Sequence, residues 1–166
     1  MNKFGFISLF FTIILYFLQF IPLGFYFQFE TPFISALVKV PIHIFAYEND
    51  EIFFWGIKMD GNFQFWFNIN LLTSIFLIIL TPLAALLNIF GFSRENIAGK
   101  KLMNANFVIL LIISLYIIIG IPIYSKEIFG IQFGYLDIFF YLNNGFFILL
   151  INVIIAGIAY FTHPIK

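Results

Sequence analysis

The stretch LMNANFVILLIISLYIIIGIPIYS, residues 102–125, carries no charged side chain. It is longer than the ~20 apolar residues that cross a ~30 Å hydrocarbon layer. Three more stretches without charge lie at residues 4–29, 63–93 and 138–165. The chain is 63% hydrophobic and has a mean hydropathy of +1.06, which is more apolar surface than a soluble core of 166 residues can hide.

We therefore expect an all-α membrane protein, a four-transmembrane-helix bundle that occupies residues 1–166 as a single integral membrane domain. The four helices are expected at about residues 5–27, 67–91, 100–124 and 138–162. The first apolar run is too long for the apolar region of a signal peptide, so we expect a retained helix. Thr81-Pro82 lies in mid-span, and proline should bend that helix while a neighbouring group binds the freed carbonyl.

The basic residues predict the orientation of the chain. Five of the eight fall at the two ends and between the second and third apolar stretches, while the other three lie among seven acidic residues on the opposite side. The positive-inside bias therefore predicts a multi-pass protein with cytoplasmic N- and C-termini. The five bases are Lys3, Arg94, Lys100, Lys101 and Lys166.

The segment of about residues 31–66, between helices 1 and 2, has the pattern of β structure. Residues 38–44 alternate between apolar and other residues, which predicts a strand, and residues 48–51 are expected to form a turn. Asp60-Gly61 between two apolar runs is a hairpin signal, because both central residues of a type I′ turn need positive φ. We expect a small extracellular antiparallel β-sheet, a meander of three strands, with Trp55 opposite Trp66.

Uncharged polar and small residues on the apolar stretches predict how the helices pack. Lipid tails are as apolar as leucine, so close approach and amide hydrogen bonds must hold such helices together. We expect Asn88, Asn152, Ala156 and Gly157 to lie at intramembrane packing contacts.

Few residues suit catalysis or ligand binding. The chain has no cysteine, and it shows no Ser-His-Asp, phosphate-loop or HExxH pattern. His43 with nearby acidic residues is a weak candidate for a metal site, and Asp137 is expected to mark a helix N-terminus. We therefore expect a non-enzymatic protein with no cofactor and no metal, and zero net charge gives no reason to expect nucleic acid as a partner.

The layout resembles that of the claudin and peripheral-myelin-protein type of four-span proteins. The resemblance rests on the helix and loop order, on Trp55-Gly56-Ile57 in the long outer loop, and on Gly145-Phe146-Phe147 at the start of the last helix. The two cysteines of the family motif are absent. The resemblance implies a left-handed four-helix bundle with an outer sheet, association through that sheet, and no catalysis.

The expected function is lateral or cell-surface association through the helix bundle and the outer β loop. The association surface is expected at Trp55, Trp66, Phe53 and Phe65, and the expected partners are membrane lipids and a second copy or another membrane protein. One alternative is a small accessory subunit of a larger respiratory or transport complex. The others are a lipid-handling membrane enzyme that uses Asp137 and His43, and a pore, which needs a continuous polar lining.

Overall fold

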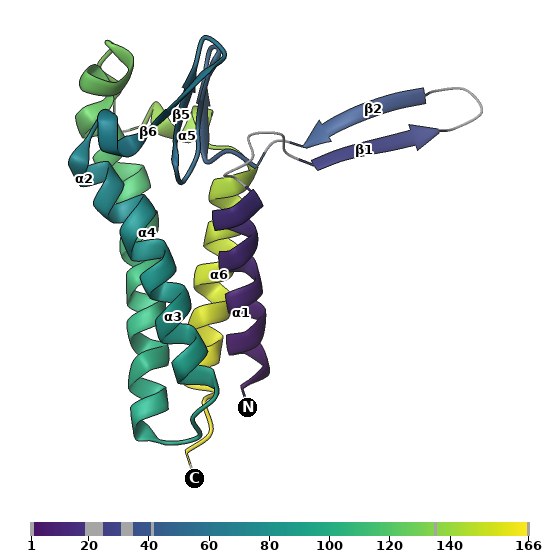
Figure 1. Cartoon of the computed structure of the whole chain (residues 1–166), viewed down its shortest axis with the longest axis vertical. Coiled ribbons are helices and arrows are strands. Elements are labelled where there is room, and N and C mark those ends of the chain that lie inside the picture. Colours follow the sequence, from purple (N-terminus) through teal and green to yellow (C-terminus); the bar gives the residue numbers. More distant parts are fainter. Residues whose placement is uncertain (1, 19–24, 31–34, 41, 135, 166) are drawn as a thin grey trace.

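The computed structural model describes residues 2–18, 25–30, 35–40, 42–134 and 136–165, and it is mostly helical (Figure 1). Three helical segments are long and apolar enough to cross a membrane: Leu71–Phe92, Ile97–Phe129 and Asn144–Phe161. A shorter apolar helix covers Lys3–Phe17. This confirms the expectation of a mostly helical chain with helices suited to crossing a membrane, and among the described residues three of them have the length for it, where four were expected.

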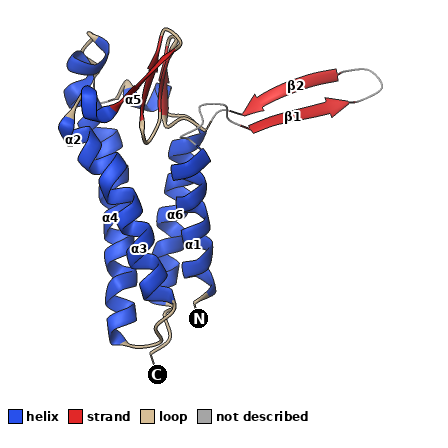
Figure 2. Ribbon diagram, viewed as in Figure 1, coloured by secondary structure: helices blue, strands red, loops and turns tan. Residues whose placement is uncertain are grey.

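The helices pack in a ring in which each segment contacts two others. Helix α1 (Lys3–Ile13) contacts α3 (Leu80–Phe92) and α6 (Asn144–Phe161), and α4 (Ile97–Phe129) contacts the same two helices. Consecutive helices run in opposite directions (Figure 1). The termini therefore lie at one end of the bundle, called here the termini end, and the β-strands lie at the other, the sheet end (Figure 2).

The observed helix bounds differ from the expected ones. Helix α1 ends in a π-helical turn, η1 (Ile14–Leu18), and residues 25–27 belong to a strand instead of the first helix. The third helix is longer than expected, continuing through Pro122 to Phe129. The expected fourth helix is split into α5 (Ile138–Tyr141) and α6, because the chain between them pairs with the sheet segment. Asn143 N–H donates to the Ile44 carbonyl at 2.9 Å, and Gly145 N–H donates to the His43 carbonyl at 3.0 Å.

The second helix follows the expectation for its proline. It consists of α2 (Leu71–Ser74), a π-helical turn η3 (Ile75–Ile79) and α3. Pro82 has no N–H to donate to the Ile78 carbonyl four residues earlier. The Tyr16 hydroxyl of η1 donates to that carbonyl at 3.0 Å, so a neighbouring helix binds the freed backbone group.

Two separate β structures lie at the sheet end. The strands β3 (Phe45–Tyr47), β4 (Asp50–Ile52), β5 (Gly56–Met59) and β6 (Asn62–Phe65) form an antiparallel meander of four strands instead of three. A second hairpin, β1 (Phe25–Glu30) with β2 (Ser35–Val40), extends sideways from the bundle (Figure 1). The expected single strand over residues 38–44 is therefore wrong, because its first part pairs with β1 and Phe45 begins a strand of the other sheet.

The hairpin turn at Asp60-Gly61 is confirmed. Asp60 has φ of 46° and Gly61 has φ of 84°, and Met59 pairs with Asn62 across the turn. The Trp66 N–H donates to the Trp55 carbonyl at 3.2 Å, so the two tryptophans lie opposite each other in this register, as expected.

Replacing Gly61 with valine should destabilise this hairpin by about 1–2 kcal/mol, because a side chain with a branched Cβ resists the left-handed conformation. A Cβ at Gly61 would meet nothing within 4 Å, so backbone strain is the whole cost. Gly61→Asn is the matched control, since asparagine tolerates positive φ. In thermal unfolding in detergent, Gly61→Val should melt at a lower temperature than Gly61→Asn. Equal melting temperatures for the two variants would contradict this description of the turn.

Candidate functional site

The four residues expected to form an association surface divide into two groups. Trp66 and Phe53 are buried, with exposed fractions of 0% and 3%, so they are not available to a partner. The Trp66 indole N–H donates to the Phe53 carbonyl at 2.9 Å, which places both in the interior of the sheet end. Phe65 keeps an exposed fraction of 40%, and Trp55 is half-buried.

Trp55 joins the sheet to the first helix. Its indole N–H donates to the Tyr16 carbonyl at 2.8 Å, and its ring lies 4.4 Å from the Tyr16 ring, measured between centroids. Because the Tyr16 hydroxyl binds Ile78, one tyrosine connects the sheet, η1 and η3. Trp55 thus holds the sheet on the bundle, while the Trp66 indole bond lies within the sheet end.

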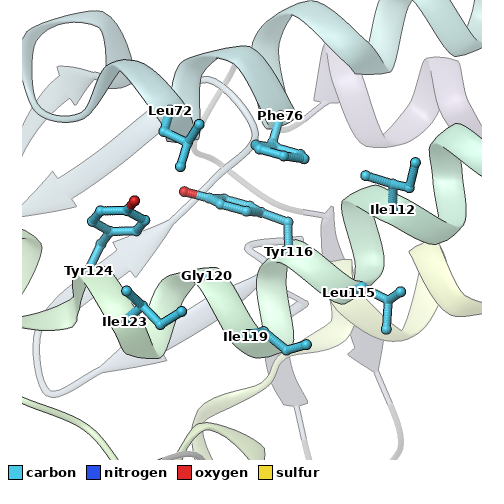
Figure 3. A pocket seen from close by; sticks show the side chains of 9 residues that line it. All are labelled: Leu72, Phe76, Ile112, Leu115, Tyr116, Ile119, Gly120, Ile123 and Tyr124. Carbon is cyan, nitrogen blue, oxygen red and sulfur yellow. The ribbon is translucent and has the colours of Figure 1, made fainter.

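A groove runs along the side of the bundle between the second helix and α4 (Figure 3). Its volume is about 320 Å³. The Phe76 and Tyr116 rings stack in it with centroids 4.3 Å apart and planes 2° apart. Gly120 leaves room for the Tyr116 ring at the base of the groove, since a methyl group there would overlap that ring. The other lining residues are Leu72, Ile112, Leu115, Ile119, Ile123 and Tyr124.

A chain of polar side chains fixes the sheet end of this groove. Thr73 donates its hydroxyl to the Asn70 amide oxygen at 3.1 Å, so the Tyr116 hydroxyl, 2.6 Å from Thr73 Oγ1, is the donor in that second contact. The Asn70 amide also accepts from the Thr73 N–H and donates to Glu127 at 2.9 Å. These bonds hold α2 against α4, and they set the width of the groove.

The outer face of α1 carries a stripe of large apolar side chains. Phe6, Phe10, Ile13 and Phe17 follow one another at helical spacing, and their exposed fractions lie between 42% and 61%. The Tyr16–Ile78 hydrogen bond places Phe17 at about the depth of Phe76, which lies in the groove. Phe17 and the groove therefore lie at about the same depth, on different faces of the bundle.

The residues expected at intramembrane packing contacts are all buried. Asn88 donates to the Gly5 carbonyl at 3.0 Å, and Asn152 donates to the Thr12 hydroxyl at 2.8 Å. Ala156 has an exposed fraction of 0%, and a Cβ at Gly157 would lie 3.3 Å from the Phe107 ring. These contacts connect α6 with both α1 and α4.

Sequence reasoning missed three polar groups. Asn2 binds the Ala159 carbonyl at 2.6 Å and His163 lies 2.8 Å from the Arg94 carbonyl oxygen, so both ends of the chain are tied to the bundle. Asn106 is fully buried in α4. Its signal in the sequence was only that of a polar residue within an apolar stretch.

The candidates for chemistry lie apart from the groove. His43 is buried with its ring 6.0 Å from the Phe53 ring, and the Asp137 carboxylate accepts from Gly134 N–H at 2.9 Å. Within the described ranges, no group of three or more histidine, aspartate or glutamate side chains could hold a metal ion. Burial raises the pKa of the Asp50 carboxyl, and the Asp60 carboxylate raises it further.

Comparisons with known protein families, with curated proteins and with solved structures each found no match to this chain. The class of the protein therefore rests on its own architecture. Three helices suited to crossing a membrane and a small four-stranded sheet define a helical membrane protein.

Proposed function

We propose that this chain is a non-enzymatic membrane protein with four spans that associates laterally with further copies of itself. In this proposal both termini are cytoplasmic and the sheet end lies outside the cell. The distribution of bases supports the orientation, since Lys3, Arg94, Lys100 and Lys101 all belong to the termini end. The fourth span would be α1 with its continuation, which is apolar and packs on two of the long helices.

One observation carries the proposal: Phe17, at the sheet end of the apolar stripe, and the groove beside α4 lie at about the same depth. Between membrane helices the driving force is close packing, because lipid is as apolar as the side chains it would release. A rigid ring that matches the shape of the groove makes closer dispersion contacts there than mobile lipid chains do. Phe17 of one copy is placed to enter the groove of the next, where Phe76 and Tyr116 present aromatic surface.

Such a contact is heterologous, because the apolar stripe and the groove are different surfaces of the same chain. Heterologous contacts generate rings or open rows of copies. The outer hairpin β1–β2 supports the same function, since a lone two-stranded hairpin is marginally stable in water and gains from a further surface. The resemblance to claudin-type proteins implies association through the outer sheet, which would add to the helix contact proposed here.

Disulfide cross-linking tests the contact, and the absence of natural cysteines removes background. One copy carries Phe17→Cys and a differently tagged copy carries Ile119→Cys, which lines the groove. Mild oxidation in the native membrane should join the two tagged copies. Either variant expressed alone should give no disulfide-linked product under the same oxidation, since the two positions belong to opposite sides of the contact.

The matched control pairs Ile119→Cys with Ile154→Cys, an equally apolar and 63% exposed position on α6. This pair should give no joined product beyond random collision. Equal cross-linking of both pairs, or none from the first, would contradict self-association through the groove.

The alternative of an accessory subunit in a larger complex uses the same exposed apolar faces with a foreign chain in place of a second copy. A discrete product with one other membrane protein in the Ile119→Cys variant alone would favour it. A pore is less well supported, because an apolar layer in which Leu77, Ile113 and Ile117 are fully buried interrupts the polar groups of the bundle interior. An enzyme that uses Asp137 and His43 is not favoured either, because the Asp137 carboxylate is bound to backbone and His43 is buried beside Phe53.

A further inference from the structure

The centre of the bundle, toward the termini end, contains polar atoms that have no partner among the residues that the structure describes. They belong to four side chains, one from each helix of the ring, and each is 0% exposed. They are Ser8 Oγ of α1, Asn88 Oδ1 of α3, both amide atoms of Asn106 of α4, and Asn152 Oδ1 of α6.

Two hydrogen bonds to α1 bring these side chains to one region. Gly5, Ser8 and Thr12 follow one face of α1. Gly5 contacts Asn88 through its carbonyl, and Thr12 accepts from Asn152, so Ser8 lies between the two amides. The interval from Gly5 to Thr12 is about 10 Å at the rise of an α-helix.

Asn106 enters the same region from α4. Met103, one turn earlier on the same face, has its Cε 2.8 Å from the position of a Cβ on Gly5. The Asn88 amide oxygen lies 3.4 Å from that same position. The turn of α4 that carries Asn106 therefore faces the Gly5–Thr12 stripe at the level of the other amides.

Leaving such groups unpaired is costly. A buried donor or acceptor without a partner costs about 1–3 kcal/mol, and buried polar groups in folded proteins are almost always hydrogen-bonded. Four side chains in one region make the cost large compared with the stability of a typical domain. A ligand that donates and accepts hydrogen bonds would remove it.

We propose that this cluster, Ser8, Asn88, Asn106 and Asn152, is an internal hydration site that binds ordered water and bridges all four helices. The chemistry of the cluster selects a neutral ligand. No described carboxylate is part of it. A cation buried without a counter-charge loses more hydration free energy than contacts with neutral oxygens restore. Water suits it, because a buried water typically makes about three hydrogen bonds to otherwise unpaired polar groups.

Methionine oxidation by radicals generated from water reports on the site. Met103 is fully buried yet lies beside the cluster, while Met59 in the sheet is partly exposed and serves as the internal reference. Radiolysis of the full chain in ¹⁸O-labelled water should oxidise Met103 with incorporation of the label. Asn106→Leu, a near-isosteric change, should abolish labelling at Met103 and leave Met59 unchanged.

Ser114→Ala is the matched control on the same helix, because its hydroxyl is buried but already donates to the Leu110 carbonyl at 3.0 Å. It should leave Met103 labelling intact. Should Asn106→Leu fail to fold, Ser8→Ala takes its place, with reduced labelling expected. Unlabelled Met103 in the parent protein, or equal labelling in the parent and the cluster variants, would overturn the proposal.

Thermal unfolding gives a second readout whose sign decides the question. If water bridges the cluster, Asn106→Leu expels that water and leaves the remaining amides without a hydrogen-bond partner, so the melting temperature falls. A rise would mean that Asn106 was simply unpaired, and it would overturn the proposal. A melting temperature that rises with sodium chloride, but not with choline chloride, would assign the site to a cation and overturn it as well.

Discussion

Replacing Trp66 with alanine is expected to lower the free energy of unfolding by about 3–5 kcal/mol, the range for a buried aromatic side chain. Trp66 is fully buried, and its indole N–H binds the Phe53 carbonyl. Its own carbonyl accepts from Ile69 and Asn70 N–H, where the sheet passes into the second helix. The alanine variant keeps these backbone bonds but loses the buried ring and the indole hydrogen bond, so it should loosen the sheet where it joins the bundle, as measured by equilibrium unfolding in mixed micelles.

Phe65→Ala is the matched control, since it removes an aromatic side chain from the neighbouring position, which is 40% exposed. It should cost less than about 1 kcal/mol, as surface substitutions usually do. Comparable losses for the two variants would mean that Trp66 does not anchor the sheet to the bundle.

The variant Ala156→Phe is expected to destabilise the bundle by about 3 kcal/mol or more, the upper part of the range for overpacking. Ala156 lies between two ties to α1, the Asn152–Thr12 and Asn2–Ala159 hydrogen bonds. A phenyl ring there would separate the two backbones and break both bonds. The melting temperature in detergent should fall sharply, and the fraction of folded protein after extraction should fall with it.

Its control, Ile154→Phe, adds an equal ring on the same helix at a position that is 63% exposed. This change should be nearly neutral. A parent-like melting curve for Ala156→Phe would show that this face of α6 contacts lipid, and the packing of α6 on α1 would be wrong.

The helical class was predictable because charge-free apolar stretches of this length are typical of membrane-spanning helices. The boundary between helix and strand was not. Residues 4–29 carry no charge and are mostly apolar, and in such a run periodicity does not separate a buried helix from a strand. The strand at Phe25–Glu30 is specified instead by its pairing with residues 35–40, which is a non-local interaction.

The two prolines within the long helices differ in how far their effects could be predicted from the sequence. Pro82 leaves the Ile78 carbonyl without an N–H donor and the Tyr16 hydroxyl binds it, as the missing N–H predicts. Pro122 does not end α4. Beyond it, Ser125 and Gln132 donate to its carbonyl at 2.7 and 2.8 Å, and these bonds hold the following turns. Only the second of these groups comes from outside the helix, and nothing local in the sequence indicates it.

The candidate site was the least predictable part. Trp55 and Trp66 were expected at an association surface, yet they bind backbone carbonyls of Tyr16 and Phe53, partners that are 39 and 13 residues away. The groove depends on the π-helical turn over Ile75–Ile79 and on Gly120 facing Tyr116. Neither feature has a pattern in the sequence that distinguishes it from ordinary helix.

The central claim, that the chain crosses the membrane between its sheet and its basic loop, is tested most directly by labelling single cysteines on intact cells. Asn49→Cys lies in the exposed turn between β3 and β4, and Ser93→Cys lies in the exposed link between α3 and α4. An impermeant maleimide should modify residue 49 at once and residue 93 only after permeabilisation. Labelling of both positions from outside would mean that Leu71–Phe92 does not span the membrane, and labelling of residue 93 alone would mean that the orientation is reversed.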